Sequence, residues 1–434
     1  MLADFKGRHV LLLQGPNGPF FRHLAAELRL AGAKVSKINL NAADAIFFPG
    51  PGALSYRGTR EKWASFLDRF LVEQQVGVIF LFGDCRPYHQ LARQVAEARG
   101  VRLYVFEEGY LRPNYVTVER GGVNKNSPMS SHPAAYQTTL EPVPSVRQVK
   151  HAFAWSVVYT ILNSFFVTFF ALLYPHYRHH RDVNFFRQTA LWARSLFRRV
   201  QRGFAQRRYL PLLSAAWSKQ YFLVGLQVHN DFQVKNSRFG DVEEFIREVV
   251  ATFAQHGQPA HRLVFKHHPA DRAYRDYGAL LRQLALEHGL GDRVVYVHDL
   301  HLPTLLRNAL GTVVINSTVG LSSLFHQTPV LALDDAIYRR MGLTAEGSLV
   351  DFFRQPPKVD RARYEAARAW LIRNNQANGS IWVRLPGTGP AGLVWPQALI
   401  SQSSAVEAPN ARAEAAIPAS RPGAVPVQAI EGAE

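Results

Sequence analysis

The sequence predicts an α/β fold with two Rossmann-like domains joined by a helical segment. Two blocks, residues 1–140 and 215–350, each alternate short apolar runs with amphipathic helix patterns, as doubly wound sheets do. The uninterrupted apolar run Val76–Phe82 is typical of a strand buried on both faces. Residues 141–214 break this alternation. A chain of 434 residues with 47% apolar content is long enough for two ordinary cores.

The first block, residues 1–140, shows strand patterns that are each followed by a turn or a helix pattern. The strands we predict are Val10–Leu13, Val35–Asn39, Ala45–Phe48, Val76–Phe82 and Val101–Phe106. The helices we predict are Phe20–Ala31 and Tyr88–Arg99. Together they form the first Rossmann-like domain, which we expect on the acceptor side of any shared site.

The insertion at 141–214 contains an uncharged apolar stretch, Ala152–Tyr174, that is long enough to cross a bilayer. Serine, threonine and asparagine residues dilute it, and one crossing would separate the two domains. If both domains form one site, a buried or interfacial helix is expected instead. Between Arg178 and Arg208, arginines recur among aromatic residues, which is typical of a membrane-surface helix. A solvated basic linker is the equally open alternative.

The second block, residues 215–350, repeats the strand and helix alternation. The strands we predict are Tyr221–Val228, Arg262–Lys266, Val294–Val297, Thr312–Ile315 and Val330–Leu333. The helices we predict are Val242–Gln255, Tyr274–His288, Leu302–Asn308 and Leu321–Gln327. Residues 351–401 are expected to form a C-terminal helical region. The tail 402–434, composed largely of Ala, Pro, Glu and Ser, is expected to be disordered.

The formal net charge of +17 calls for acidic partners, such as nucleic acid, anionic lipid or phosphorylated small molecules. No nucleic-acid-binding signature is present, so we expect no nucleic acid partner. The single cysteine, Cys85, excludes an internal disulfide framework and fits a reducing compartment. No signal peptide pattern is seen at the N-terminus. We therefore expect a cytoplasmic protein.

Polar residues follow several predicted strands directly, at the edge where open α/β sheets bind ligands. The candidates from the first domain are Arg86, Glu107, Glu108 and Arg112. The candidates from the second domain are Gln227, Asp231, Lys266, His268, Pro269, Asn316, Ser317 and Thr318. Asp231 and Glu108, one from each domain, would supply the carboxylate pair used in glycosyl chemistry.

The segment Asn316–Gly320 is the clearest phosphate-site candidate, because helix N-termini favour anions. A plain helix cap without a ligand remains the alternative, and no P-loop motif is present. Lys266 and His268 could neutralise a phosphate or hold a ribose. The histidines His267, His268, His298 and His301 could converge, but no metal-binding spacing is seen, so ligand contact is favoured and no metal is expected.

Taken together, several motifs resemble a known family. They are Gly83–Pro87, Phe106–Pro113 (FEEGYLRP), Gly121–Asn124, Leu226–Asp231, His268–Pro269 and Asn316–Ser317. Over about residues 5–350 the chain resembles the capsular polysaccharide synthesis/export proteins of the KpsS/LipB type, which are related to KpsC and other bacterial β-Kdo transferases. The FEEGYLRP segment is the most specific of these motifs.

The resemblance implies a GT-B-like retaining β-Kdo transferase. It would use CMP-Kdo and no separate cofactor, and would place the first Kdo of a poly-Kdo linker on a phosphatidylglycerol-type lipid. Asp231 matches the acid proposed as nucleophile, and Glu108 the acid of the N-terminal domain, with Glu107 as the alternative one position away. Gln227, His268, Asn316 and Ser317 match donor-binding positions.

The resemblance also implies a protein bound peripherally to the cytoplasmic face of the inner membrane, with other capsule synthesis and export proteins as partners. CMP-Kdo carries a phosphate and a carboxylate, which suits Lys266, Arg112 and Arg86 as further donor contacts. Two alternatives remain open. One is a non-catalytic assembly or export component that binds lipid-linked glycan, and the other is an inverting GT-B enzyme with another donor, such as a UDP-sugar.

Overall fold

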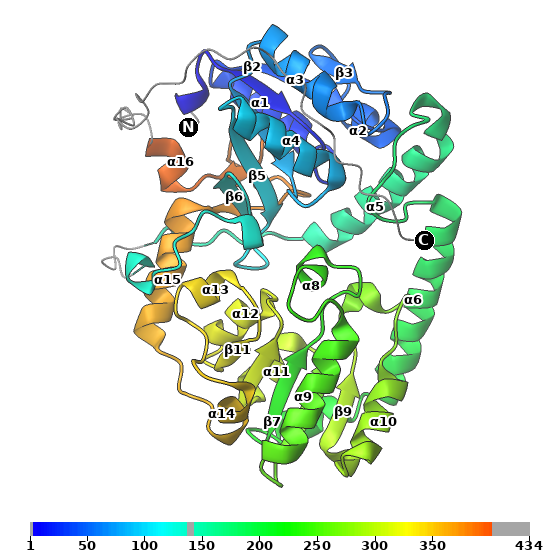
Figure 1. Ribbon diagram of the computed structural model, residues 1–434, viewed down its shortest axis with the longest axis vertical. Helices are drawn as coiled ribbons and strands as arrows, with labels where there is room; N and C mark the ends of the chain where they lie inside the picture. Colours follow the sequence, from blue (N-terminus) through cyan, green and yellow to red (C-terminus); the bar gives the residue numbers. More distant parts are fainter. Residues whose placement is uncertain (1–2, 137–142, 402–434) are drawn as a thin grey trace, which may run out of the picture.

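The computed structural model describes residues 3–136 and 143–401, and it contains two α/β domains, one above the other in Figure 1. Each domain is built on one sheet. Two further segments connect the domains on opposite sides of the molecule, the helical insertion on the right and helix α15 on the left of Figure 1. The predicted class, an α/β fold of two Rossmann-like domains in a GT-B-like arrangement, is confirmed.

The N-terminal domain holds an eight-stranded sheet in the order β13-β12-β6-β5-β4-β1-β2-β3. Strands β3, β2, β1, β4 and β5 are parallel, and β6, β12 and β13 add antiparallel pairings at one side. The strands are β1 (His9–Leu12), β2 (Lys34–Asn39), β3 (Ala53–Ser55), β4 (Val78–Phe82), β5 (Arg102–Glu108), β6 (Tyr115–Arg120), β12 (Gln376–Gly379) and β13 (Leu393–Val394). The helices are α1 (Phe20–Leu30), α2 (Ala42–Phe47), α3 (Trp63–Glu73), α4 (Pro87–Ala98) and α16 (Gln397–Ser401).

The C-terminal domain holds a five-stranded, fully parallel sheet in the order β11-β10-β7-β8-β9. The strands are β7 (Tyr221–Gly225), β8 (Arg262–Lys266), β9 (Val294–Val297), β10 (Gly311–Val314) and β11 (Val330–Ala332). The helices are α8 (Phe232–Lys235), α9 (Val242–His256), α10 (Gly278–Glu287), α11 (Leu302–Asn308), α12 (Val319–Phe325), α13 (Ile337–Arg340) and α14 (Leu349–Arg354).

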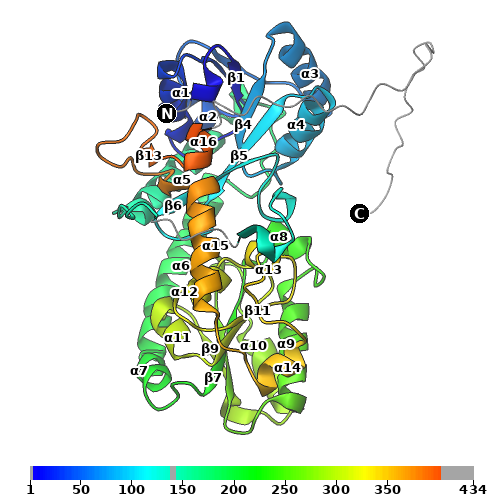
Figure 2. The same ribbon diagram turned by 90° about the vertical axis from the view of Figure 1, so that its left-hand side faces the viewer.

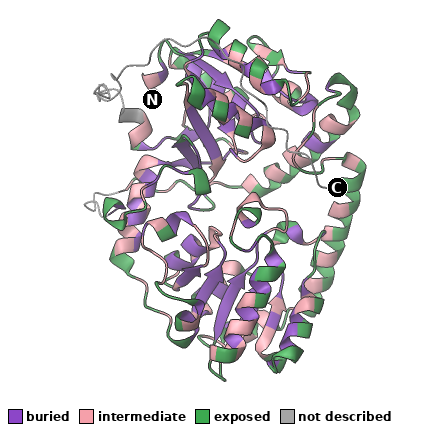
Figure 3. Ribbon diagram, in the orientation of Figure 1, coloured by how far each residue is buried: buried purple, intermediate pink, exposed green. Residues whose placement is uncertain are grey.

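Both sheets are covered on their two faces, so their central strands are almost completely buried (Figure 3). Every residue of β7 is buried, and in β4 only Phe82 at the carboxyl end reaches partial exposure. This is the environment that continuous apolar runs predict for parallel sheets. Burial of the two cores fixes the strand ends, and the carboxyl ends of both sheets face the space between the domains.

The predicted strand Ala45–Phe48 is wrong, because this segment belongs to helix α2 (Ala42–Phe47). The Asn41 side chain accepts a hydrogen bond from the backbone N–H of Asp44 (2.9 Å) and caps the helix start. The next strand of the sheet is the short β3 (Ala53–Ser55), which pairs with β2. A four-residue apolar run is too short to show a strand or helix period, so the pattern alone could not distinguish the two. The Asn41 cap favours the helix.

The region 351–401 is more than the helical segment that the sequence predicts. Helix α15 (Arg361–Asn374) runs from the C-terminal domain back to the N-terminal one, as Figure 2 shows. The chain then adds β12 to the N-terminal sheet, antiparallel to β6. The buried carboxylate of Glu27 accepts hydrogen bonds from the Trp395 indole (2.6 Å) and the Ala391 backbone (2.7 Å). The C-terminal segment is therefore part of the first domain.

The insertion contains α5 (Ala152–Phe169), α6 (Phe185–Ala205) and α7 (Tyr209–Ser214). By length and composition α5 could cross a membrane, and only 11% of this apolar window is buried. Of the two expected alternatives, a buried or an interfacial helix, the buried one is wrong, since a core helix would hide its apolar side chains. The interfacial alternative stays a prediction. The predicted disordered tail, residues 402–434, lies outside the described residues.

Candidate functional site

A cavity of about 390 Å³ lies between the carboxyl ends of the two sheets. Its wall contains all the predicted site residues except Lys266 and Pro269. The first domain contributes Arg86, Glu107, Glu108 and Arg112, and the second contributes Gln227, Asp231, His268, Asn316, Ser317 and Thr318. Acids from both domains and arginines from the first thus share one crevice, as the sequence predicts. The roles of these residues stay predictions.

The acids of the first domain are the last two residues of β5, Glu107 and Glu108. Phe106, the residue before them, is aligned with Phe82 at the end of β4, so both strands deliver polar side chains to the same edge. The chain then passes very close to β6, where a Cβ on Gly109 would lie 2.2 Å from the Tyr115 carbonyl oxygen. Only glycine fits there, which explains the glycine after the two acids.

The two glutamates differ in their surroundings. Burial raises the pKa of Glu107 to about 7, and the neighbouring Glu108 carboxylate adds to this effect. Its Oε1 atom accepts a hydrogen bond from the Glu108 backbone N–H (3.0 Å). Glu108, by contrast, forms an ion pair with Arg112 (2.9 Å). Glu107 can therefore exchange a proton near neutral pH, whereas Glu108 is held by a cation.

The amide side chains of Gln227 and Asn316 form the base of the cavity on the second domain. Gln227 follows β7 and Asn316 follows β10, and these strands are neighbours in the sheet. The Gln227 Nε2 donates to Asn316 Oδ1 (3.0 Å), and the Asn316 backbone N–H donates to Gln227 Oε1 (3.3 Å). Asn316 Nδ2 also donates to the Gln233 carbonyl oxygen (3.2 Å). The pair ties both strand ends to the start of α8.

Asp231 lies at the N-cap of helix α8, where its carboxylate accepts a hydrogen bond from the Gln233 backbone N–H (2.9 Å). The loop that leads to it is held by the buried Asp271, which accepts hydrogen bonds from the His229 ring and from the His229 backbone N–H (3.1 Å). These contacts fix the backbone on both sides of Asp231. The carboxylate is thus oriented by the loop and remains in the cavity wall.

A single thiol lies among the carboxylates of the two domains. The pKa of the Cys85 thiol is raised to about 12 by burial first, then by the neighbouring Asp84, with Glu107 and Asp231 adding to the effect. Such a thiol is protonated at neutral pH, so it does not act as a nucleophile. Cys85, Glu107 and Asp231 all line the same cavity, so this thiol faces acids from both domains.

Cations and a neutral imidazole complete the polar wall. Arg86 lies over the Phe82 ring (5.2 Å) and donates to the Gly15 carbonyl oxygen (3.1 Å). Burial lowers the pKa of His268 to about 4, and the nearby Lys266 and Arg112 contribute in the same direction. His268 is therefore neutral at physiological pH and can donate or accept a hydrogen bond.

Two predicted donor contacts, Lys266 and Pro269, lie outside the cavity wall. The Lys266 ammonium is buried and donates to the His298 carbonyl oxygen at the end of the adjacent strand β9 (3.2 Å). Pro269 opens a short 3-10 turn, while His268 and Ala270 on either side of it line the cavity. These two side chains therefore do not line the cavity, and their role as donor contacts stays a prediction.

Among the wall residues that the site prediction did not include are Asn124, His180 and Arg181. Asn124 comes from the loop after β6, and His180 and Arg181 come from the loop between α5 and α6. The Gly121–Asn124 motif was a usable signal for the first. Nothing in the sequence indicated the other two, because an arginine-rich insertion normally reads as surface. Its loop nevertheless reaches the cavity, anchored by a hydrogen bond between Gln14 Nε2 and the Tyr177 hydroxyl (2.9 Å).

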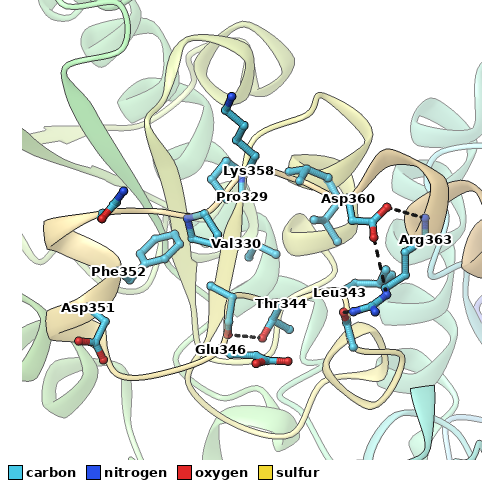
Figure 4. A pocket seen from close by; sticks show the side chains of 16 residues that line it. Pro329, Val330, Leu343, Thr344, Glu346, Asp351, Phe352, Lys358, Asp360 and Arg363 are labelled. Carbon is cyan, nitrogen blue, oxygen red and sulfur yellow. Dashed lines mark hydrogen bonds and ion pairs between the residues drawn. The ribbon is translucent and has the colours of Figure 1, made fainter. Parts of the chain in front are cut away.

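In residues 3–136 and 143–401, no group of three or more His, Cys, Asp or Glu side chains could hold a metal ion. A second cavity of about 320 Å³ lies by the start of β11, at the opposite end of the strand from the domain interface (Figure 4). Asp360 and Arg363 in its wall are paired with each other. It lacks the convergent acids of the interdomain cavity.

Comparison with known proteins places this architecture in a family. The profile of the capsule polysaccharide biosynthesis proteins matches residues 77–382. The chain is 36% identical over 374 residues to the capsule polysaccharide export protein KpsS of Escherichia coli, covering 86% of this chain and 96% of the relative. The chain belongs to the capsule polysaccharide biosynthesis protein family. This confirms the predicted resemblance to the KpsS/LipB type.

Other members and structures extend the comparison. The capsule polysaccharide modification protein LipB of Neisseria meningitidis serogroup A is 34% identical over 386 residues, covering 86% of this chain and 91% of LipB. Among solved structures, the β-Kdo 2,7 transferase KpsC of Thermosulfurimonas dismutans is similar with a TM-score of 0.40 and 13% identity, covering 85% of this chain and 92% of that one. The family match covers the segments that contribute both carboxylates, Glu108 and Asp231.

Proposed function

We propose that this member of the capsule family is a retaining glycosyltransferase that moves Kdo from CMP-Kdo to a phosphatidylglycerol-type lipid. The reaction would start the poly-Kdo linker of a capsular polysaccharide. The single observation that carries the proposal is the interdomain cavity, in which carboxylates of both domains meet arginines and the paired amides of Gln227 and Asn316. GT-B-like domain pairs bind nucleotide sugars between their sheets, where strand ends converge.

The donor is acidic at two points, its phosphate and the sugar carboxylate. Arg86 and Arg112 supply positive charge from the first domain, and the neutral His268 supplies a hydrogen-bonding ring from the second. In this proposal Asn316, Ser317 and Thr318 contact the nucleotide on the phosphate side, together with Gln227. Positive charge beside a departing phosphate stabilises the transition state more than protonation does, because CMP is already a good leaving group.

The chemistry takes two steps in which every atom is accounted for. The Asp231 carboxylate attacks the anomeric carbon, the bond from that carbon to the CMP phosphate oxygen breaks, and CMP leaves as an anion. The lipid hydroxyl then attacks the same carbon, its proton passes to a glutamate, and the bond to Asp231 breaks. Of the two glutamates, Glu107 has the pKa suited to proton transfer, while Glu108 and Arg112 hold the acceptor side in place.

We further propose that the protein works at the cytoplasmic face of the inner membrane, bound peripherally, with other capsule proteins nearby. The acceptor lipid resides in that bilayer, and the basic insertion fits an anionic surface. No separate cofactor is needed for this chemistry, since the donor carries the leaving group.

The test is an assay of purified protein with CMP-Kdo and a fluorescent phosphatidylglycerol, in which mass spectrometry detects a lipid heavier by one Kdo. Wild type should form the product, Asp231→Ala should form none, and Asp292→Ala, which removes an exposed carboxylate outside the cavity wall, should retain activity. Product formation by Asp231→Ala would refute the nucleophile assignment. Transfer from a UDP-sugar in place of CMP-Kdo would refute the donor.

A second function is favoured by one observation, the similarity of the chain to the capsule polysaccharide export protein of Escherichia coli. It would make this chain a non-catalytic component that binds lipid-linked glycan. The same assay separates the two, since an assembly component would bind the lipid-linked glycan and form no product with any donor. The raised pKa of Glu107 supports the catalytic choice, because glycan binding alone has no use for an acid that exchanges protons near pH 7.

A further inference from the structure

The two long helices of the insertion, α5 and α6, bury polar residues and expose apolar ones, which is the reverse of a helix in a soluble protein. The only buried residue of α6 is the polar Gln188, and the only buried residues of α5 are Asn163 and Ser164. Most of the exposed large hydrophobic side chains of the described chain belong to this insertion. A helix in a soluble protein normally turns its apolar stripe to the core. Here that stripe points outward.

Helix α6 is attached to the C-terminal domain through polar groups. Arg272 Nη1 donates to Ser195 Oγ (3.0 Å), and Arg198 Nη1 donates to the Arg272 carbonyl oxygen (2.8 Å). One turn on, Arg202 pairs with Asp276. Gln206 Nε2 donates to the Tyr296 carbonyl oxygen (3.1 Å), and Gln206 Oε1 accepts from the His298 backbone N–H (2.9 Å). The helix is thus fixed in its orientation by its polar side.

The opposite side of α6 carries Phe186, Phe197, Val200 and Phe204 in one stripe, because helical residues 7, 11, 14 and 18 apart share a face. Their exposed fractions are 65%, 68%, 52% and 71%. The end of α5 continues the surface, since the rings of Phe165 and Phe169 contact Phe185 and Phe186. We call this continuous surface of α5 and α6 the apolar arm. It forms the right-hand side of the molecule in Figure 1.

Charge decides what can cover the arm. Exposed arginines accompany the stripe: Arg187, Arg194 and Arg199 lie on α6, and Arg207 and Arg208 lie just after it. Asp182 is the sole acidic residue between Arg178 and Arg208. A second copy of this chain would bring like charges together, which disfavours a dimer through this face. An anionic bilayer offers both an apolar interior for the phenylalanines and phosphates for the arginines.

We infer that the apolar arm is the surface with which this protein lies on an anionic membrane, with the apolar faces of α5 and α6 immersed at the headgroup boundary. The inference rests on the proposed function for its purpose and deepens it. The loop between the two helices carries His180 and Arg181 into the wall of the interdomain cavity. The arm therefore joins the bilayer to the cavity, and Arg181 is placed to meet the phosphate of a lipid headgroup as it enters.

Vesicle flotation tests the arm. Wild type should float with phosphatidylcholine vesicles containing phosphatidylglycerol, and less so at high salt. The variant Phe197→Glu with Phe204→Glu should lose at least about tenfold of its vesicle-bound fraction, because both side chains leave the bilayer. Leu286→Glu is the matched control, since Leu286 on α10 is also exposed (81%) but lies off the arm. If the double variant floats like Leu286→Glu, the inference is wrong.

Two further measurements keep the result interpretable. Charge reversal at Arg194→Glu with Arg199→Glu should also abolish flotation, which covers the case in which the phenylalanine variant fails to fold. Transfer to a water-soluble, short-chain phosphatidylglycerol should survive in the double variant, whereas transfer to vesicle-embedded lipid should be lost. A wild type that floats but transfers no Kdo would overturn the proposed function and leave the arm intact. A wild type that does not float overturns the arm alone.

Discussion

Gln227 and Asn316 bind each other reciprocally across two neighbouring strand ends, with Gln227 Nε2 donating to Asn316 Oδ1 (3.0 Å) and the Asn316 backbone N–H donating to Gln227 Oε1 (3.3 Å). Both hydrogen bonds are therefore present in the absence of a ligand. This leaves the pair in a single orientation in the cavity wall, ready to meet the donor. Because the two amide side chains are already ordered, less conformational entropy is lost when a ligand binds to them.

Gln227→Ala should break this pair and leave the Asn316 amide without its partner. Loss of a hydrogen bond to a partly buried group costs about 1–2 kcal/mol, so KM for CMP-Kdo should rise about tenfold while the thermal midpoint falls slightly. Gln283→Ala is the control, because Gln283 is an exposed glutamine on α10 that also makes one side-chain contact, to Glu287. Equal kinetics in both variants would count against donor contact through this pair.

Glu107 gives the site a pH dependence whose sign follows from burial. Its pKa in the folded protein is about 7, above the ordinary value of 4.5. Between these two pH values the folded state retains a proton that the unfolded state releases, so stability falls as pH rises through about 7. If Glu107 takes the acceptor proton, activity should rise over the same range, because the base must be deprotonated.

Glu107→Gln should remove both effects. Its thermal midpoint should exceed that of wild type increasingly from pH 5 to pH 8, and the rate should lose its rising limb near pH 7. Glu108→Gln is the matched control, because it keeps the neighbouring position and changes a partly exposed carboxylate that is paired with Arg112. A pH–rate profile that moves in Glu108→Gln and not in Glu107→Gln would assign proton transfer to the other glutamate.

The sequence predicted the two sheets and most of the cavity, and it failed where long-range contacts decide. Residues at strand ends such as Glu108 and Asp231 could be placed because parallel strands deliver their carboxyl ends to one edge. Lys266 was misplaced because its partner, the His298 carbonyl oxygen, comes from another strand. Likewise, no local sequence pattern predicts that the residues after Asn375 join the first sheet. None predicts that the loop at Arg181 reaches the cavity.

Arg181 is expected to act on the acceptor and not on the donor. Arg181→Ala should raise KM for phosphatidylglycerol about tenfold and leave KM for CMP-Kdo nearly unchanged, because a charge-assisted phosphate contact is worth about 1.5–3 kcal/mol. Arg178→Ala, three residues away and outside the cavity wall, is the control. A larger effect on the donor than on the lipid would move Arg181 to the nucleotide side.

The buried histidine His267 predicts sensitivity to acid. Burial lowers its pKa to about 4, and Arg202 on α6 contributes in the same direction. The unfolded chain takes up a proton near pH 6.5 while the folded protein does not, so stability is lost as pH falls from about 6.5 to 4. One histidine can account for at most about 1.4 kcal/mol per pH unit in that window. His267→Phe should flatten the decline of the urea midpoint, whereas the exposed His288→Phe should not.

Glu27 gives the sharpest test of the returning C-terminal segment. Its buried carboxylate accepts from the Trp395 indole N–H (2.6 Å) and the Ala391 backbone N–H (2.7 Å), more than 360 residues along the chain. Glu27→Ala leaves both donors buried without a partner, so the free energy of unfolding should fall by about 2–5 kcal/mol. Removal of the exposed Glu97, which pairs with Arg93 on α4, should cost less than about 1 kcal/mol.

Trp395 reports on the same contact directly. When the Glu27 acceptor is lost, the indole should become exposed to water, and its fluorescence should shift to longer wavelength before the rest of the protein unfolds. The Trp395→Phe variant identifies this signal among the seven tryptophans. If Glu27→Ala unfolds at the same urea concentration as Glu97→Ala, with unchanged fluorescence, the C-terminal segment is not held to the first domain by this carboxylate. The pairing of β12 with β6 and the side-chain contacts of Asn375, Gln376 and Asn378 would then carry the attachment.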